Sequence, residues 1–122
     1  MNFPNHQFSW KVLGAVFKKT GRVTESLFAL QKAVGINPKD AESHNNLSNV
    51  LREIGKLEES EASCRQAIAL NPGYVSAHYN LGITLQELGR FEEAELRYRQ
   101  AIELDPDHAK AHLDLGNVLK EL

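Results

Sequence analysis

Apolar residues recur at helical spacing in short stretches that are separated by polar turns. One stretch predicts a helix whose buried face is formed by Ala77, Leu81, Leu85 and Leu88. The next stretch predicts a second helix that buries Ala94, Tyr98, Ala101 and Ile102. Gly89 favours a helix end between them, because glycine adopts a left-handed backbone at no steric cost. Pro106 ends the second helix, since proline lacks an N–H group. The pattern predicts a helical hairpin over residues 75–108.

The same pattern returns every 34 residues along the chain. All four prolines share one register, at Pro4, Pro38, Pro72 and Pro106. Other residues also recur at intervals of 34, and we call each such set a column. The columns are Gly21, Gly55 and Gly89; His44, His78 and His112; Leu13, Leu47, Leu81 and Leu115; and the small residues Gly14, Ser48, Gly82 and Gly116. We therefore predict one domain that contains units 7–40, 41–74 and 75–108, a trailing helix 109–122, and residues 1–6 as the end of a preceding unit.

A single hairpin of this kind cannot bury its apolar stripe alone. Neighbouring units must therefore stack side by side and form a continuous core. The predicted fold class is all-α, an α-solenoid of tandem antiparallel helical hairpins.

The unit resembles the tetratricopeptide repeat, whose 34-residue pattern runs Trp, Leu-Gly, Tyr, then Ala, Phe and Pro. The first copy matches this pattern with Trp10, Leu13, Gly14, Phe17, Ser26, Leu30, Ala33 and Pro38, and the third with His78, Leu81, Gly82, Leu85, Ala94, Tyr98, Ala101 and Pro106. The resemblance covers all but the first few residues and implies a right-handed superhelix. The sequence Asn80-Leu81-Gly82 is also similar to repeats of the O-linked N-acetylglucosamine transferase superhelix and of bacterial arrays like it.

The composition excludes several classes of protein. Apolar residues make up 42% of the 122 residues and charged residues 25%, which argues against disorder and against a fibrous protein. No apolar run approaches the roughly 20 residues of a membrane span. The N-terminal residues also lack the basic and apolar segments of a signal peptide. The single cysteine, Cys64, fits a reducing compartment. We expect a cytoplasmic protein that does not bind membranes.

The net charge of −2 is unevenly distributed along the chain. Residues 1–39 carry six lysine and arginine side chains against Glu25 alone, a net charge of +5, which leaves −7 on the remainder. Such a division can polarise a binding groove or favour head-to-tail contacts. Nucleic-acid-binding proteins are more often basic overall, so we expect no nucleic-acid partner.

The residue types that often carry chemistry have simpler structural interpretations here. The register histidines lie on different units, a helix diameter or more apart, whereas zinc ligands converge at about 2 Å from the metal. Cys64 shares the core column of Leu30 and Tyr98, which predicts a buried, inert thiol. Acidic pairs at 58–59 and 92–93 open second helices and complement the positive helix end. We predict no catalytic residue, metal or cofactor, and therefore no enzyme activity.

The resemblance implies that first helices line a concave groove through fixed positions of each unit. Those positions hold Phe8, Lys11, Val12, Ala15, Lys18 and Lys19; Glu42, Asn45, Asn46, Asn49, Arg52 and Glu53; Ser76, Tyr79, Asn80, Ile83, Gln86 and Glu87; and Lys110, Leu113, Asp114 and Asn117. An amide both donates and accepts hydrogen bonds, so Asn46 and Asn80 could each hold one peptide group of an extended ligand. The alternative is that these amides bond only to neighbouring helices or water. Acidic ligand residues would point towards Lys11 and Lys18.

Chaperone-binding members of the family grip a terminal carboxylate with two lysines, two asparagines and an arginine. Asn49, Asn80 and Lys110 stand at matching positions, but Asn45 replaces the first lysine and Asp114 replaces the arginine. An acid at that position would repel a carboxylate, which argues against this clamp.

These observations favour a protein-interaction module that binds an extended peptide or partner segment. One alternative is a substrate-docking or regulatory segment of a larger enzyme such as a glycosyltransferase. Another is an excised or engineered array with no ligand of its own.

The last copy contains a first helix without the second helix that would cover it. Terminal units of a solenoid usually carry a polar outer face, but this copy has the residues of an internal unit. An uncovered apolar strip favours association with another copy. We therefore expect a chain cut from a longer array that forms homo-oligomers through residues 109–122, with contacts from Leu115, Val118, Leu119 and Leu122.

Overall fold

The computed structural model describes residues 7–122, with side chains described from Trp10 onward. The described residues form only helices, in the order α1 (Gln7–Lys19), α2 (Val23–Ile36), α3 (Ala41–Glu53), α4 (Leu57–Leu70), α5 (Val75–Glu87), α6 (Phe91–Leu104) and α7 (Ala109–Glu121). None of these helices is long and apolar enough to cross a membrane. The predicted end of a preceding unit at residues 1–6 and the side chain of Phe8 lie outside the described residues.

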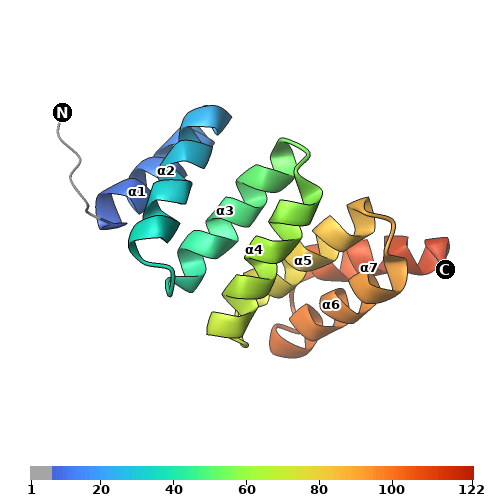
Figure 1. Cartoon of the computed structure of the whole chain (residues 1–122). Helices are drawn as coiled ribbons and strands as arrows, with labels where there is room; N and C mark the ends of the chain where they lie inside the picture. The colour runs from blue at the N-terminus through green and yellow to red at the C-terminus, as the bar shows by residue number, and fades with distance from the viewer. Residues whose placement is uncertain (1–6) are drawn as a thin grey trace.

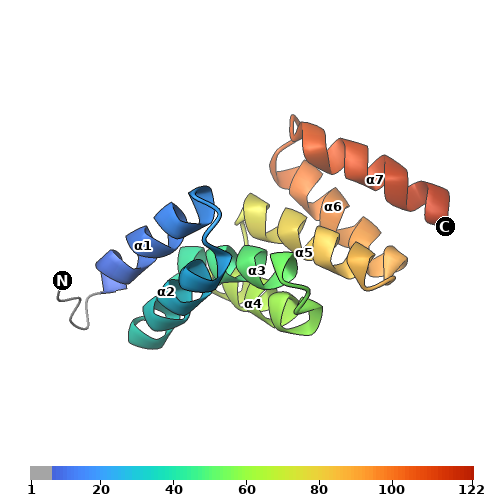
Figure 2. The ribbon, with the colours of Figure 1, turned by 90° about the horizontal axis from the view of Figure 1, so that it is seen from above.

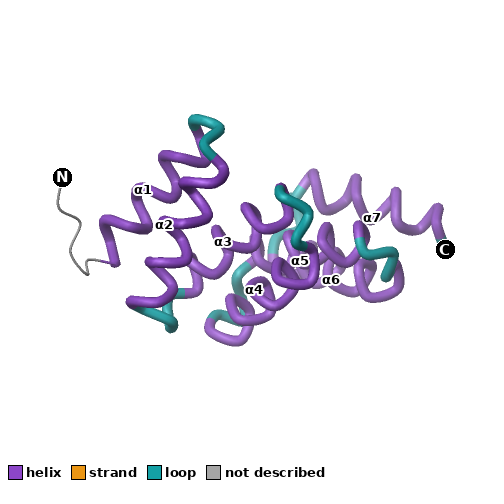
Figure 3. Tube along the Cα trace, turned by 45° about the horizontal axis from the view of Figure 1, so that its top comes forward, coloured by secondary structure: helices purple, strands orange, loops and turns teal. Residues whose placement is uncertain are grey.

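The helices form a row that runs from α1 at one end to α7 at the other (Figure 1). Consecutive helices pack against each other, and short loops join them (Figure 3). The first helix of each unit also contacts the first helix of the next, along the series α1, α3, α5 and α7. We call the surface along this series the first-helix face. In the view from above, the row bends between its two ends (Figure 2). The predicted all-α solenoid is confirmed.

Glycines end the first helices as the sequence predicts. Gly21, Gly55 and Gly89 have φ angles of 76°, 82° and 80°, in the left-handed region. At the third turn, the Gly89 N–H donates to the Gln86 carbonyl at 3.0 Å and the Arg90 N–H donates to the Leu85 carbonyl at 2.9 Å. This is the Schellman motif, which satisfies the carbonyl groups left free at a helix end.

The register histidines fix the turns between units. Nε2 of His44, His78 and His112 lies 2.7, 2.8 and 2.8 Å from the carbonyl oxygen of the proline six residues earlier. Each first helix is therefore tied to the turn that precedes it. These contacts give the histidine column a structural role.

The small-residue column allows the two helices of a hairpin to approach closely. A Cβ atom on Gly82 would lie 2.6 Å from Cε1 of Tyr98, and one on Gly14 would lie 2.6 Å from Cγ of Leu30. In the second unit the column holds Ser48, and Cys64 takes the place of the larger side chains. A glycine therefore faces a large side chain in the first and third hairpins, and a serine faces a smaller one in the second. Cys64 is fully buried, and burial raises the pKa of its thiol, as expected for an inert core residue.

A network of ion pairs joins the second helices of successive units. The guanidinium of Arg90, which precedes α6, lies 2.8 Å from Glu61 of α4 and 2.8 Å from Glu93. Arg65 lies 2.9 Å from Glu61. Burial alone would raise the pKa of Glu61, but hydrogen bonds from Arg90 and Arg65 outweigh it and hold that pKa below its usual value. The network couples the second unit to the third.

Candidate functional site

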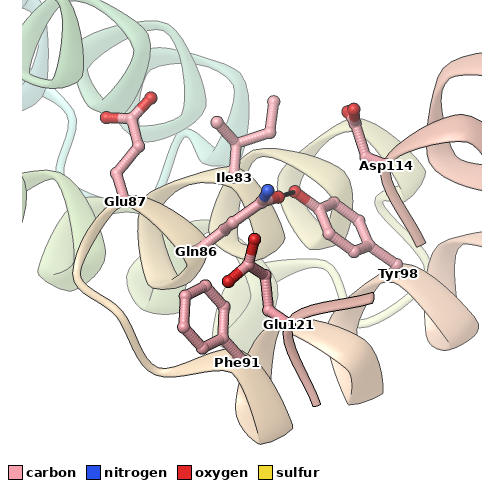
Figure 4. Close-up of a pocket in the computed structure, with 7 residues that line it drawn as sticks. All are labelled: Ile83, Gln86, Glu87, Phe91, Tyr98, Asp114 and Glu121. Atoms are coloured by element: carbon pink, nitrogen blue, oxygen red, sulfur yellow. Dashed lines mark hydrogen bonds between the residues drawn. The ribbon is translucent and has the colours of Figure 1, made fainter. Parts of the chain in front are cut away.

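A pocket of about 440 Å³ lies on the first-helix face between α5, α6 and α7. We call it the C-end pocket. It is lined by Ile83, Gln86, Glu87, Phe91, Tyr98, Asp114 and Glu121 (Figure 4). Three of these are acidic and none is basic. Glu87 and Glu121 are exposed and form no ion pair within the described residues. The C-end pocket therefore carries uncompensated negative charge above an aromatic floor.

Two tyrosines hold the polar wall of the C-end pocket in place. The Tyr98 hydroxyl donates to Oε1 of Gln86 at 2.7 Å (Figure 4). The Tyr79 hydroxyl donates to Oδ2 of Asp114 at 2.6 Å. Burial raises the pKa of both tyrosines, with a further contribution from the hydrogen bond to Asp114 for Tyr79 and from the charge of Asp114 for Tyr98, so both hydroxyls remain protonated donors at neutral pH.

A second pocket of about 350 Å³ lies near the other end of the row, against α1, α2 and α3. We call it the N-end pocket. It is lined by Gly14, Ala15, Lys18, Lys19, Leu30 and Asn46. Lys18 and Lys19 form no ion pair within the described residues. The N-end pocket thus places two free ammonium groups beside an apolar floor.

The two pockets are built from equivalent positions of the repeat. Each uses the ninth, twelfth, thirteenth and twenty-fourth residues of one unit and the sixth residue of the next unit. In the N-end pocket these are Ala15, Lys18, Lys19, Leu30 and Asn46, and in the C-end pocket they are Ile83, Gln86, Glu87, Tyr98 and Asp114. The fold therefore repeats one hollow along the first-helix face and varies its charge.

The equivalent place between the second and third units holds Asn49, Arg52, Glu53 and Asn80. Here Oδ1 of Asn49 and Nη1 of Arg52 are buried without a hydrogen-bond partner in the part of the chain that the structure describes. One is an acceptor and the other a donor. Hydrogen-bonding capacity therefore remains unused at the middle of the face.

The predicted asparagine row is partly used inside the fold. Nδ2 of Asn80 donates to Oδ1 of Asn45 at 2.9 Å, and Nδ2 of Asn45 donates to Oγ of Ser76 at 3.2 Å. Asn45 is only 4% exposed and Asn80 6% exposed. Asn46 is half-buried and lines the N-end pocket. Asn80 thus bonds to Asn45 of the preceding unit, and Asn46 is the more accessible member of the predicted pair.

The predicted lysines also differ in availability. Nζ of Lys11 lies 3.0 Å from Asp40 and 3.1 Å from Glu42, so its charge is already paired inside the chain. Lys18 lines the N-end pocket, whereas Lys110 and Asn117 are exposed on α7. The structure does not bring the carboxylate-clamp positions together as a free set, because Asn45 is buried and Asp114 bonds to Tyr79.

The last helix presents a different surface. Gly116 has no atom within 4 Å of an added Cβ, unlike Gly14 and Gly82. Leu119 and Leu122 are 44% and 55% exposed, but Val118 is fully buried and Leu115 packs against the same core cluster. Val118 is therefore a core residue of this chain. Leu119 and Leu122 are the members of the predicted self-association set that remain accessible.

Sequence reasoning missed the second-helix residues that form the pocket floors. Leu30 and Tyr98 are buried, as their core column predicts, and they also lie beneath the pockets. Phe91 lines the C-end pocket and was not singled out from the sequence. The small residue at the eighth position of each unit is the signal that could have indicated this. It lets the two helices of a hairpin approach closely, which brings the twenty-fourth residue of the unit towards the first-helix face. Glu121, contributed by α7, was missed as well.

Comparisons with known proteins agree with this architecture. A family profile described as "Tetratricopeptide repeat" matches residues 39–107, more than half of the chain, and another with that description matches residues 9–40. No curated protein sequence matches the chain.

Three solved structures illustrate the similarity. A Thermobaculum terrenum O-GlcNAc transferase mutant is 29% identical with a TM-score of 0.88, and the match covers 98% of this chain and 23% of that one. YrrB, described as a TPR protein with an unusual peptide-binding site, is 28% identical with a TM-score of 0.85, over 96% of this chain and 58% of that one. The first TPR of Spaghetti (RPAP3), bound to the HSP90 peptide SRMEEVD, is 24% identical with a TM-score of 0.92, over 94% of this chain and 91% of that one.

Proposed function

Because the chain belongs to the tetratricopeptide repeat family, we propose that it is a non-catalytic interaction module that binds an extended peptide or partner segment along the first-helix face. The observation that carries this proposal is the pair of register-equivalent pockets on that face. An extended ligand also presents its side chains at regular intervals, so a repeated hollow suits it. YrrB, a similar structure, is described as having a peptide-binding site.

The residues between the pockets suit the backbone of such a ligand. Each peptide group offers one N–H donor and one C=O acceptor. Oδ1 of Asn49 and Nη1 of Arg52 are an unpaired acceptor and donor that are buried in the free chain, and rotation of these side chains would present them to such a peptide group. Amides of Asn46 and Asn80 add further hydrogen-bonding groups beside them. Backbone contacts of this kind tolerate many ligand sequences, so the pockets would supply the selectivity.

The test is selection of binders from a library of random peptides long enough to span both pockets. We expect the chain to select peptides, and the double variant Asn46→Ala/Asn80→Ala to weaken their binding. Two lost hydrogen bonds of about 1 kcal/mol each correspond to a roughly 30-fold loss of affinity. Gln66→Ala on the exposed surface of α4 removes an amide outside the groove and should leave binding unchanged.

The Asn80 amide bonds to Asn45, so its loss could also disturb the fold. Circular dichroism and the urea midpoint of the double variant separate that effect from a loss of contacts. If the folded double variant binds within twofold of the parent chain, or if no peptide is selected, the groove assignment is wrong.

A second candidate follows from the similarity to the O-GlcNAc transferase structure. In this alternative, the same face docks protein substrates for a catalytic domain in a longer parent protein. Binding to the isolated chain would be the same in both cases. Transfer of a sugar to the selected peptides by the parent protein would support the docking role.

A further inference from the structure

We propose that the segment bound on the first-helix face is bipolar, with acidic residues at the N-end pocket and a lysine or arginine at the C-end pocket. This inference rests on the proposed function and specifies the chemistry of its ligand. Its basis is that the two register-equivalent pockets carry opposite charges that have no ion-pair partner within the described residues.

The N-end pocket suits an acidic side chain. Lys18 and Lys19 occupy the twelfth and thirteenth positions and have no carboxylate partner within the described chain. Lys11, on the same helix, is already paired with Asp40 and Glu42 and adds no free charge. Ala15 is exposed and provides apolar contact for the methylene groups of the ligand, above the buried Gly14 and Leu30, and the Asn46 amide provides a donor.

The C-end pocket suits a long cationic side chain. Phe91 and Ile83 are half-buried and can contact the aliphatic stem of a lysine or arginine, and the Phe91 ring also attracts its charge. Carboxylates of Glu87, Asp114 and Glu121 surround the same space (Figure 4). Asp114 already accepts a bond from Tyr79, so Glu87 and Glu121 are the carboxylates of this pocket that have no partner among the residues the structure describes. Charge-assisted hydrogen bonds to a guanidinium or ammonium group would satisfy them.

The middle of the face is nearly balanced in charge. Arg52 and Glu53 stand at the positions that hold two lysines in the first unit and Gln86 with Glu87 in the third. At these two positions the charge therefore passes from positive in α1 through mixed in α3 to negative in α5. This gradient gives the ligand a preferred orientation, because reversing it would bring like charges together at both ends.

The helix spacing sets the distance between the charged ligand residues. The two pockets lie two units apart, and adjacent packed helices are separated by about 8–10 Å, which gives about 16–20 Å in total. An extended chain advances about 3.3 Å per residue, so the acidic and basic residues should be about five or six positions apart.

The experiment uses synthetic fluorescent peptides with blocked termini and identical composition. Two have glutamates at one end and lysines at the other, in opposite orders, with about four uncharged residues between the charged pairs. The third alternates the same charges. We expect one of the two segregated peptides to bind about tenfold more tightly than the alternating one, a difference that shrinks as salt is raised.

Charge reversal at one pocket tests the assignment directly. Glu87→Lys/Glu121→Lys should weaken the preferred peptide about tenfold and should favour a peptide whose lysines are replaced by glutamates. Glu58→Lys/Glu92→Lys, at exposed positions of α4 and α6, reverses two charges in the same direction outside the groove and serves as the matched control.

The proposal is overturned if the alternating peptide binds as tightly as both segregated ones. It is also overturned if the double reversal weakens binding no more than the control does, or if none of the peptides binds at about 1 mM. The library selection and the Asn46/Asn80 variant decide the groove assignment separately. Library peptides that depend on those asparagines but show no charge preference would therefore leave the proposed function standing and remove the bipolar ligand.

Discussion

The close approach of the two helices in the third hairpin leads to a sharp prediction about Gly82. In Gly82→Ala, the new methyl group would lie 2.6 and 2.7 Å from two ring atoms of Tyr98. That ring is fully buried and its hydroxyl is bonded to Gln86. The ring cannot yield without disturbing the core or breaking this bond. Gly116 occupies the same repeat position in α7, but an added Cβ there meets nothing within 4 Å.

The two substitutions should therefore change stability in opposite directions. Replacing glycine by alanine inside a helix gains about 0.5–1 kcal/mol in each case. Overpacking of a core costs about 1–3 kcal/mol, and contacts this short point to the upper part of that range. We expect Gly82→Ala to lower the free energy of unfolding by about 1–2 kcal/mol. Gly116→Ala should raise it by about 0.5–1 kcal/mol.

Urea unfolding followed by circular dichroism measures the difference. With a slope of about 2 kcal/mol per molar urea, the two midpoints should lie about 1 M apart. The second unit supplies a further control, because its Ser48 faces the smaller Cys64. In a Tyr98→Cys background, Gly82→Ala should be neutral or stabilising. A Gly82→Ala chain at least as stable as the parent would refute the packing argument.

Two further predictions concern the ion-pair network and the last helix. The pKa of Glu61 is lowered in the folded chain, so its contribution is present above its unfolded pKa and is lost as pH falls through the folded value. Glu61→Gln should therefore reduce the free energy of unfolding at pH 7 by about 0.5–1 kcal/mol. Unfolding midpoints measured between pH 3 and pH 7 should also fall less steeply with decreasing pH in the variant than in the parent chain. Equally steep falls would contradict this role of Glu61. The exposed Leu119 and Leu122 favour concentration-dependent self-association that persists in salt, and Leu119→Lys should reduce it in sedimentation experiments. A strict monomer across a hundredfold range of concentration would refute self-association, and an unchanged assembly in the variant would place it on another surface.

The helices and turns were predictable because each depends on local chemistry repeated at a fixed interval. Gly89 requires only a left-handed residue at a helix end, and the spacing of Leu81 and Leu85 requires only that one face be buried. Repetition strengthened each such signal, since several copies had to agree.

The contacts between side chains were not predictable in the same way. The resemblance to the repeat family implied that Lys11 and Asn45 lie on the first-helix face, but the sequence could not show that Lys11 reaches Asp40 or that Asn45 reaches Asn80. Those contacts depend on rotamers and on the offset between neighbouring helices. Whether Tyr98 fills the space beneath the face or lines a pocket likewise depends on how closely α5 and α6 approach.

Backbone packing in the described chain joins only consecutive helices or successive first helices, and ion pairs add a link between successive second helices. An extra hairpin of the same pattern, inserted between Tyr74 and Val75, would therefore meet the kind of neighbour that each existing hairpin already has. The groove would gain one more hollow, and each helix contact interrupted by the insertion would be replaced by a contact of the same kind. At about 8–10 Å per helix spacing and about 3.3 Å per extended residue, each added hairpin would lengthen the recognised segment by about three residues. Ligand length is thus a modular property of this architecture, adjustable in whole steps by duplication or deletion of a unit.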